Sequence, residues 1–139
     1  MRVILCDVNY FLDIFLKREP FYESAAKLFT MVEKVKVKGY ACSLTFPVLF
    51  YLLSKEIGRI QTVKTLERVR IVFKVATVDE RVIDLSLVSD FKDFEDAVQY
   101  YSALDVGVNY IISRNKGDFP YRKIPVLTSD EFLAINKHL

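Results

Sequence analysis

Short apolar runs alternate with amphipathic stretches along the whole chain. Because these runs are mostly apolar, they are typical of parallel strands that are buried on both faces. The stretches between them repeat apolar residues at the spacing of a helix. The pattern predicts an α/β fold with a parallel sheet covered by helices on both faces. Strands are expected over residues 3–6, 39–43, 71–75, 110–113 and 124–127.

Capping residues suggest where the helices between these strands begin. Helices are expected over residues 10–16, 21–35, 45–57, 62–69, 77–88 and 94–104, and after residue 128. Thr45, Thr77, Asp93 and Thr128 are the expected N-caps, because short polar side chains accept hydrogen bonds from the first-turn amides. Gly107 is the expected stop after residues 94–104.

Composition indicates one domain that spans residues 1–139. A chain of 139 residues with 52 % hydrophobic residues can bury a single core without staples. The chain has only four Gly and four Pro, and we see no linker and no internal repeat. The net charge of +2 predicts no affinity for nucleic acid by itself.

Expectations for location follow from the apolar runs and the cysteines. The first run meets Asp7 after four apolar residues, too few for a signal peptide. No run approaches the roughly 18 apolar residues of a membrane span, so no membrane partner is expected. Cys6 and Cys42 are expected as reduced core residues, and the protein as cytoplasmic.

Three aspartates are expected at one edge of the sheet. Asp7 follows the first strand, Asp118 comes shortly after the fourth, and Asp96 lies just inside the helix that precedes the fourth. Ligands of open parallel sheets bind beyond the carboxyl ends of the strands. Two carboxylates about 4 Å apart repel by roughly 4 kcal/mol at an effective dielectric near 20. The spacing therefore predicts an oxygen-rich site for Mg²⁺ or Mn²⁺.

Each acid also has a purely structural interpretation. Asp7 and Asp118 suit turns, and Asp96 with Glu95 suits the positive end of a helix. His138 is the only histidine, which argues against a site built on histidine.

Taken in order, these residues resemble the PIN domain, a family that holds many VapC-type toxin ribonucleases. The resemblance is carried by Asp7-Val8-Asn9, by Asp96, and by the segment Ser113-Arg114-Asn115-Lys116-Gly117-Asp118-Phe119. It implies a three-layer α/β/α sandwich around a parallel sheet of four to five strands. It also implies hydrolysis of RNA at an acidic pocket that holds Mg²⁺ or Mn²⁺.

The resemblance assigns expected roles to seven residues. Asp7, Asp96 and Asp118 would be the catalytic acids and metal ligands. Asn9 and Asn115 would support the pocket, and Arg114 and Lys116 would contact an RNA phosphate. The family also implies an antitoxin partner and a homodimer.

One position departs from the family. An acid is usual on the helix after the second strand, where this chain has Val48. Two functions therefore stay open: a ribonuclease of a toxin–antitoxin pair, or a weakened or inactive PIN-fold protein that binds RNA or another protein. Apolar residues beyond what one helix face usually buries could serve a dimer or antitoxin groove, namely Phe11, Leu12, Phe46, Leu49, Phe50 and Tyr51.

Overall fold

The chain folds as alternating strands and helices, as the apolar pattern predicts. The computed structural model describes residues 1–119 and 123–139, with Asp118 by its backbone alone. Within these ranges, no helix is long and apolar enough to cross a membrane. The elements are β1 (Val3–Cys6), α1 (Val8–Phe15), α2 (Tyr22–Glu33), β2 (Lys38–Cys42), α3 (Thr45–Ile57), α4 (Arg59–Val72), β3 (Lys74–Ala76), α5 (Glu80–Leu87), α6 (Phe94–Val106), β4 (Tyr110–Ile112), the 3₁₀ turn η1 (Lys116–Asp118), β5 (Val126–Leu127) and α7 (Ser129–Ile135).

The sheet has five parallel strands in the order β3-β2-β1-β4-β5. The central strand, β1, has β2 and β4 on its two sides, so that Cys6 lies opposite both Ala41 and Ile112. Because all strands run the same way, their carboxyl ends meet at one edge. The segments that follow β1, β2 and β4 therefore start close together.

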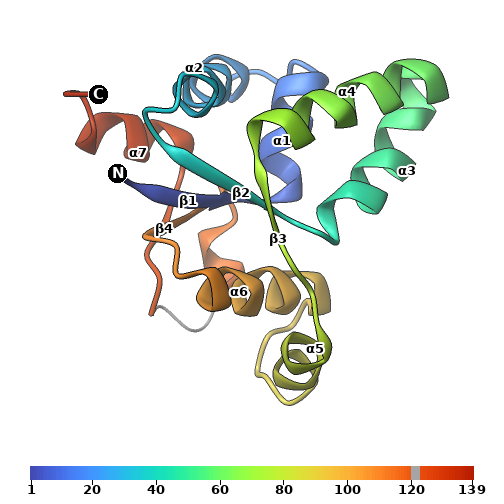
Figure 1. The fold of residues 1–139 in the computed structure, drawn as a ribbon, viewed down its shortest axis with the longest axis vertical. Coiled ribbons are helices and arrows are strands. Elements are labelled where there is room, and N and C mark those ends of the chain that lie inside the picture. The colour runs from blue at the N-terminus through green and yellow to red at the C-terminus, as the bar shows by residue number, and fades with distance from the viewer. Residues whose placement is uncertain (120–122) are drawn as a thin grey trace.

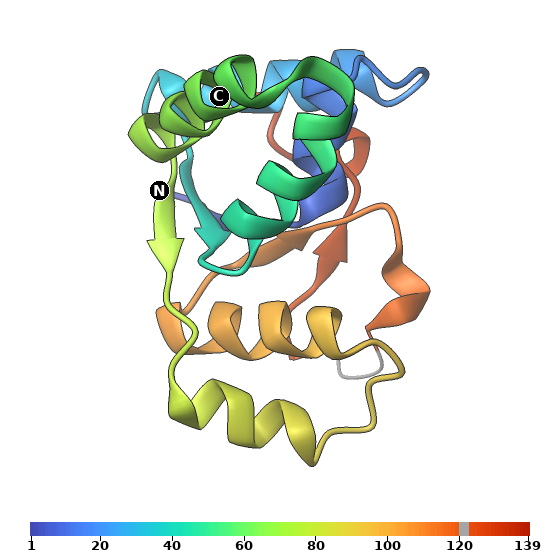
Figure 2. The same ribbon diagram turned by 90° about the vertical axis from the view of Figure 1, so that its right-hand side faces the viewer.

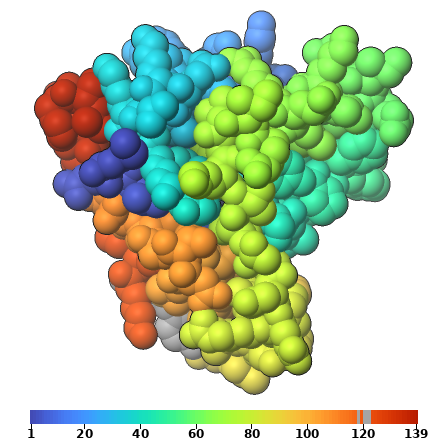
Figure 3. All heavy atoms as spheres, viewed as in Figure 1, coloured from blue at the N-terminus to red at the C-terminus, as the bar shows by residue number. Residues whose placement is uncertain are grey.

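Helices cover both faces of the sheet, which confirms the three-layer α/β/α sandwich. Helices α1, α2, α3, α4 and α7 lie on one side, and α6 with α5 beyond it lies on the other (Figures 1 and 2). Along β1, Ile4 and Cys6 join the first core and Leu5 joins the second. The space-filling view shows α3 and α4 as a lobe beside the sheet, and α5 at the opposite tip (Figure 3).

The two cysteines are small core residues. Cys6 and Cys42 are both free thiols with no exposed surface, which confirms that prediction. The Cys42 Sγ lies 3.6 Å from the Ser102 Oγ, which links β2 to α6.

The predicted strand over residues 71–75 is wrong at its start. Helix α4 continues to Val72, and β3 covers only Lys74–Ala76. The β-branched residues at 71 and 72 favour a strand. However, Val69 and Phe73 are buried four residues apart, which is the spacing of a helix, and Ile71 is 85 % exposed. Burial of the helical face therefore decides the conformation.

Two of the four predicted N-caps are wrong. Thr45 is the first residue of α3, and the cap position holds Leu44 with no side-chain hydrogen bond. Helix α5 is capped by Asp79, whose carboxylate accepts from the Val82 N–H, and Thr77 lies two residues too early. The other two predictions are confirmed. Asp93 accepts from the Asp96 N–H, and Thr128 forms a capping box with Glu131.

Most of the apolar residues suggested for an interface are used by the core. Phe11, Leu12 and Leu49 are buried, and Phe46 packs partly against the same cluster. The exceptions are Tyr51, which is 61 % exposed, and Phe50, which is partly buried and in neither core cluster.

A close approach between β2 and two helices gives a stability prediction. A Cβ at Gly39 would lie 2.6 Å from the Phe73 Cε2 and 2.8 Å from the Val32 Cγ1. Gly39→Ala should therefore lower the free energy of unfolding by about 1–3 kcal/mol, since overpacking strains a close-packed core. Urea denaturation measures it. Gly117→Ala is the matched control, because nothing lies within 4 Å of its Cβ position. Equal stability of the two variants would contradict the prediction.

Candidate active site

Asp7 lies at the carboxyl end of the central strand. Its backbone is extended, and its carboxylate accepts a hydrogen bond from the Tyr10 N–H at 2.9 Å, so it is the N-cap of α1. The residue is only 5 % exposed, and its side chain also hydrogen-bonds to Ser113, just past β4. Asp7 can therefore cap α1 and also take part in a site at this edge of the sheet.

The environment of Asp7 disfavours its charged form. The pKa of Asp7 is raised to about 6, chiefly because burial removes water from the carboxylate. Hydrogen bonds from Ser113 and Tyr10 lower this pKa, the nearby Asp13 carboxylate raises it, and Arg114 lowers it. A bound cation would relieve the remaining penalty.

A buried ion pair lies beside Asp7. Asp13, on α1, is 3 % exposed and receives two hydrogen bonds from Arg114: Nε to Oδ2 at 2.9 Å and Nη2 to Oδ1 at 3.0 Å. Arg18 approaches the same carboxylate at 3.8 Å. The Arg114 guanidinium also lies over the Phe21 ring, 4.1 Å from its centroid. The pairing raises the pKa of Arg114.

Asp13 was not among the predicted site residues. The available signal was a carboxylate in the middle of the apolar run over residues 11–15. A charge at such a position needs a partner. Its partner lies 101 residues away, and no local pattern indicates which residue that is.

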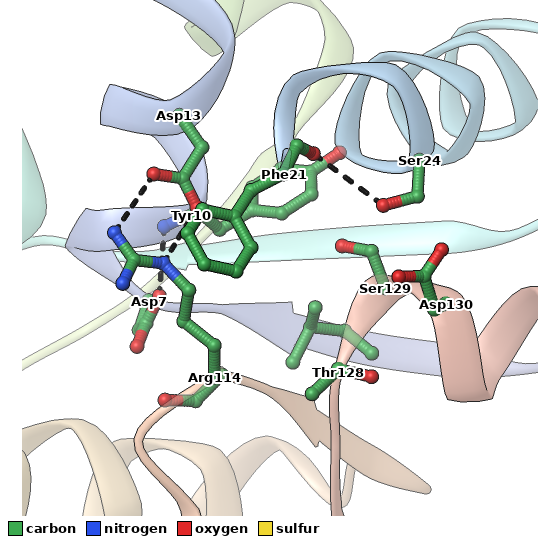
Figure 4. A pocket seen from close by; sticks show the side chains of 11 residues that line it. Asp7, Tyr10, Asp13, Phe21, Ser24, Arg114, Thr128, Ser129 and Asp130 are labelled. Carbon is green, nitrogen blue, oxygen red and sulfur yellow. Dashed lines mark hydrogen bonds and ion pairs between the residues drawn. The ribbon is translucent and has the colours of Figure 1, made fainter. Parts of the chain in front are cut away.

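A cavity opens between Asp7 and the start of α7 (Figure 4). Its volume is about 440 Å³, counting the part open to solvent. Tyr10, Phe21 and Ile112 supply apolar walls, while Ser129 and Asp130 line the side formed by α7. We refer to this space as the Asp7 cavity.

Asp96 lies in the first turn of α6. This helix leads into β4, so its start lies at the same edge as the carboxyl ends of the strands (Figure 2). The carboxylate of Glu95 contributes to a raised pKa of the Cys42 thiol, behind burial as the main cause, which places this turn near the end of β2. Asp93 acts as the cap, and Asp96 is partly buried.

The remaining predicted site residues lie around the segment after β4. Asn9 Oδ1 accepts a hydrogen bond of 3.4 Å from Arg18. Asn115 is exposed, and its backbone N–H donates to the Ser113 Oγ at 3.1 Å. Lys116 forms an ion pair of 2.6 Å with Glu131 on α7. The side chain of Asp118 lies outside the part of the chain that the structure describes.

The decisive comparison is with a family model. The model of the PIN domain matches residues 3–117. The chain belongs to the PIN domain family. No curated protein sequence matches the chain.

Solved structures share the fold of this PIN domain at low sequence identity. FitAcB from Neisseria gonorrhoeae aligns with a TM-score of 0.67 and 15 % identity, over 91 % of this chain and 97 % of that one. DNA-bound VapBC from Salmonella typhimurium aligns with a TM-score of 0.67 and 15 % identity, over 93 % of this chain and 99 % of that one. VapC20 from Mycobacterium tuberculosis, a sarcin-ricin loop cleaving toxin, aligns with a TM-score of 0.63 and 14 % identity, over 78 % of this chain and 86 % of that one. These likenesses establish the fold.

The PIN domain has an apolar side chain where the second acid was expected. Val48 lies in the first turns of α3 and packs partly against the core that α1 and α2 share. Glu56, two turns further along α3, is exposed. Among the side chains that the structure describes, no three His, Cys, Asp or Glu residues are grouped so that they could hold one metal ion.

The side chains at this edge still offer oxygen atoms, which are the ligands that a hard cation such as Mg²⁺ prefers. Asp7 is a buried carboxylate that lacks a full counter-charge, and Asp96 lies at the same edge. Among the described residues, four buried side-chain oxygens have no hydrogen-bond partner. Two of them are Thr45 Oγ1, at the start of α3, and Gln99 Oε1, one turn after Asp96; the others are Ser54 Oγ and Asn136 Oδ1. Mg²⁺ is commonly held by one or two carboxylates together with water and substrate oxygens.

The raised pKa of Asp7 predicts a pH-dependent stability. The folded-state pKa of about 6 exceeds the ordinary value of 3.8, so stability should fall as pH rises from about 4 to 6 and then level off. Asp7→Asn keeps a capping oxygen and removes the charge. In metal-free buffer at pH 7.5, it should therefore raise the free energy of unfolding by about 1–3 kcal/mol.

Urea denaturation at pH 4 and pH 7.5 tests this expectation. The gain should vanish at pH 4, where both side chains are neutral in the folded protein. Asp84→Asn, at an exposed position of α5, is the control and should change little at either pH. A gain that is the same at both pH values would contradict the assignment of the titrating group.

Proposed function

We propose that this PIN domain is a Mg²⁺- or Mn²⁺-dependent ribonuclease whose site is built on Asp7, Asp96 and Asp118. The observation that carries the proposal is the buried, under-compensated carboxylate of Asp7 at the carboxyl edge of a parallel sheet. Membership of the PIN family supports hydrolysis of RNA as the reaction. The neighbour described as a sarcin-ricin loop cleaving toxin points the same way.

The chain's own residues would hold and orient the reacting groups. A bound Mg²⁺ would supply an activated water and stabilise charge at the scissile phosphate. The Tyr10 N–H and Ser113 fix the Asp7 carboxylate, so that its remaining lone pairs are directed to the site. Asp96 would bind from the start of α6, and Asp118 from the segment after β4. Asn9 and Asn115 would support this arrangement.

Arg114 is the better placed of the two predicted phosphate contacts. Its guanidinium is held by Asp13 through Nε and Nη2, and its side chain is 29 % exposed beside Asp7. A guanidinium fixed in this way can donate further hydrogen bonds to an RNA phosphate at little loss of side-chain entropy. Lys116 would act at the rim, where it now pairs with Glu131.

We further propose that the protein acts in the cytoplasm as the toxin of a toxin–antitoxin pair. Support comes from neighbours that are described as VapBC and FitAB assemblies. An antitoxin or a second copy of the chain could use the exposed Tyr51 and the neighbouring partly buried Phe46 and Phe50 on α3.

A non-catalytic PIN-fold protein is the second candidate. Val48 favours it, because the site lacks one carboxylate and one negative charge that relatives use. Such a protein would bind RNA or a protein partner at the same edge without turnover.

Removal of the Asp7 charge tests the enzyme directly. Asp7→Asn should abolish Mn²⁺-dependent RNA cleavage, a loss of at least about 100-fold, while the protein stays folded, because the helix cap is preserved. It should also remove the rise in melting temperature that Mn²⁺ gives the wild type by mass action. Cleavage assays and thermal melts provide the two readouts, with Asp84→Asn as control. Cleavage by Asp7→Asn at the wild-type rate would contradict the assignment of Asp7 as a catalytic residue.

Restoring the acid on α3 separates the two candidates. Val48→Glu should increase cleavage by about 10-fold or more and tighten Mn²⁺ binding, since a further carboxylate would face the ion. Val48→Gln is the matched control, which has the same shape without the charge. Calorimetric titration with Mn²⁺ accompanies the cleavage assay. RNA binding without turnover by both the wild type and Val48→Glu would favour the non-catalytic protein.

A further inference from the structure

We propose that the Asp7 cavity is a nucleobase subsite, which binds a base of the RNA next to the cleaved phosphate and prefers bases that carry an amino group. This inference rests on the proposed function in taking RNA as the substrate. It adds a binding site and a source of sequence preference.

The position of the cavity links it to the reacting phosphate. Asp7 lies at one side of the cavity and Ser129 and Asp130 lie at the other, with residues of α1 and α2 between them (Figure 4). A phosphate bound at Asp7 would therefore bring one of its flanking nucleotides to the mouth of the cavity. Part of the roughly 440 Å³ between the walls is open to solvent, so a base could lie against the walls while its sugar and phosphates stay outside.

The wall of the cavity is planar and held in place. Phe21 as a residue is 36 % exposed, and the Arg114 guanidinium lies 4.1 Å from the centroid of its ring. The buried Asp13 fixes that guanidinium through two hydrogen bonds. Bases stack on aromatic rings and on guanidinium planes in single-stranded RNA recognition. A fixed wall loses little freedom when a base stacks on it.

The charges in the cavity select against a second phosphate. Three carboxylates line it, those of Asp7, Asp13 and Asp130, against the single cation Arg114, which Asp13 already pairs. A neutral, planar group with N–H donors suits these surroundings better than an anion does. Asp130 and the hydroxyl groups of Ser24 and Ser129 supply acceptors on the side facing the Phe21 wall (Figure 4).

This donor pattern distinguishes the bases. Adenine, cytosine and guanine each carry an exocyclic amino group, whereas uracil does not. A carboxylate accepts a hydrogen bond from such an amino group. Asp130 is therefore the residue expected to set the preference, and Phe21 to set the affinity for every base.

Binding of the four nucleosides tests the subsite without any cleavage. Adenosine, cytidine, guanosine and uridine are titrated into the metal-free protein and followed by amide chemical shifts. Uridine should bind at least about fivefold more weakly than the others. Phe21→Leu should weaken the binding of every nucleoside by about 5- to 150-fold, which is the range expected when one stacking contact with a base is lost. Asp130→Asn should bring the amino nucleosides close to uridine. Asp84→Asn, at an exposed position of α5, is the control.

Cleavage of short RNAs that differ at one position gives the second readout. Phe21→Leu should raise KM with kcat retained, and Asp130→Asn should reduce the base preference at that position. No nucleoside binding, or binding that neither variant changes, overturns the subsite even if the wild type cleaves RNA. Absence of cleavage by the wild type would count against the proposed function, whereas the nucleoside titration would still decide the subsite.

Discussion

The buried ion pair between Asp13 and Arg114 is the constraint on which the site depends. It joins the last turn of α1 to the second residue after β4 by two hydrogen bonds of 2.9 and 3.0 Å. Asp13 is buried, so removal of Arg114 would leave its carboxylate with only Arg18, 3.8 Å away, as an ion-pair partner among the described residues. The pair therefore fixes where the chain leaves the sheet, and so where the segment with Asn115 and Asp118 begins.

The same region carries a charge that folding does not stabilise. Asp7 serves the fold as the cap of α1, yet its burial and the neighbouring Asp13 keep its pKa near 6. Arg114 offsets only part of this penalty, because its two strongest hydrogen bonds go to Asp13. A positive charge placed near this carboxylate would favour its ionised form and relieve part of the penalty. The proposed cation site therefore coincides with the least favourable charge of this edge.

Apolar packing limits how much negative charge the edge can hold. Val48 packs partly against the core between the sheet and α1, at the position where an acid was expected. Across the site, the walls formed by Phe21 and Tyr10 are also apolar. The site is consequently a small group of oxygens set among hydrophobic side chains, in which each charge has a large effect on its neighbours.

Local patterns in the sequence were enough to predict the three-layer fold and the Asp7 edge. Burial of β1 and β4 shows as continuous apolar runs, and the caps Asp93 and Thr128 act on amides three residues away. Where two local signals competed, the prediction was wrong: α4 extended into the predicted strand because Phe73 is buried at helical spacing. Asp13 and Arg114 are separated by 101 residues. Their contact depends on how α1 and β4 pack together, and only the tertiary structure decides that.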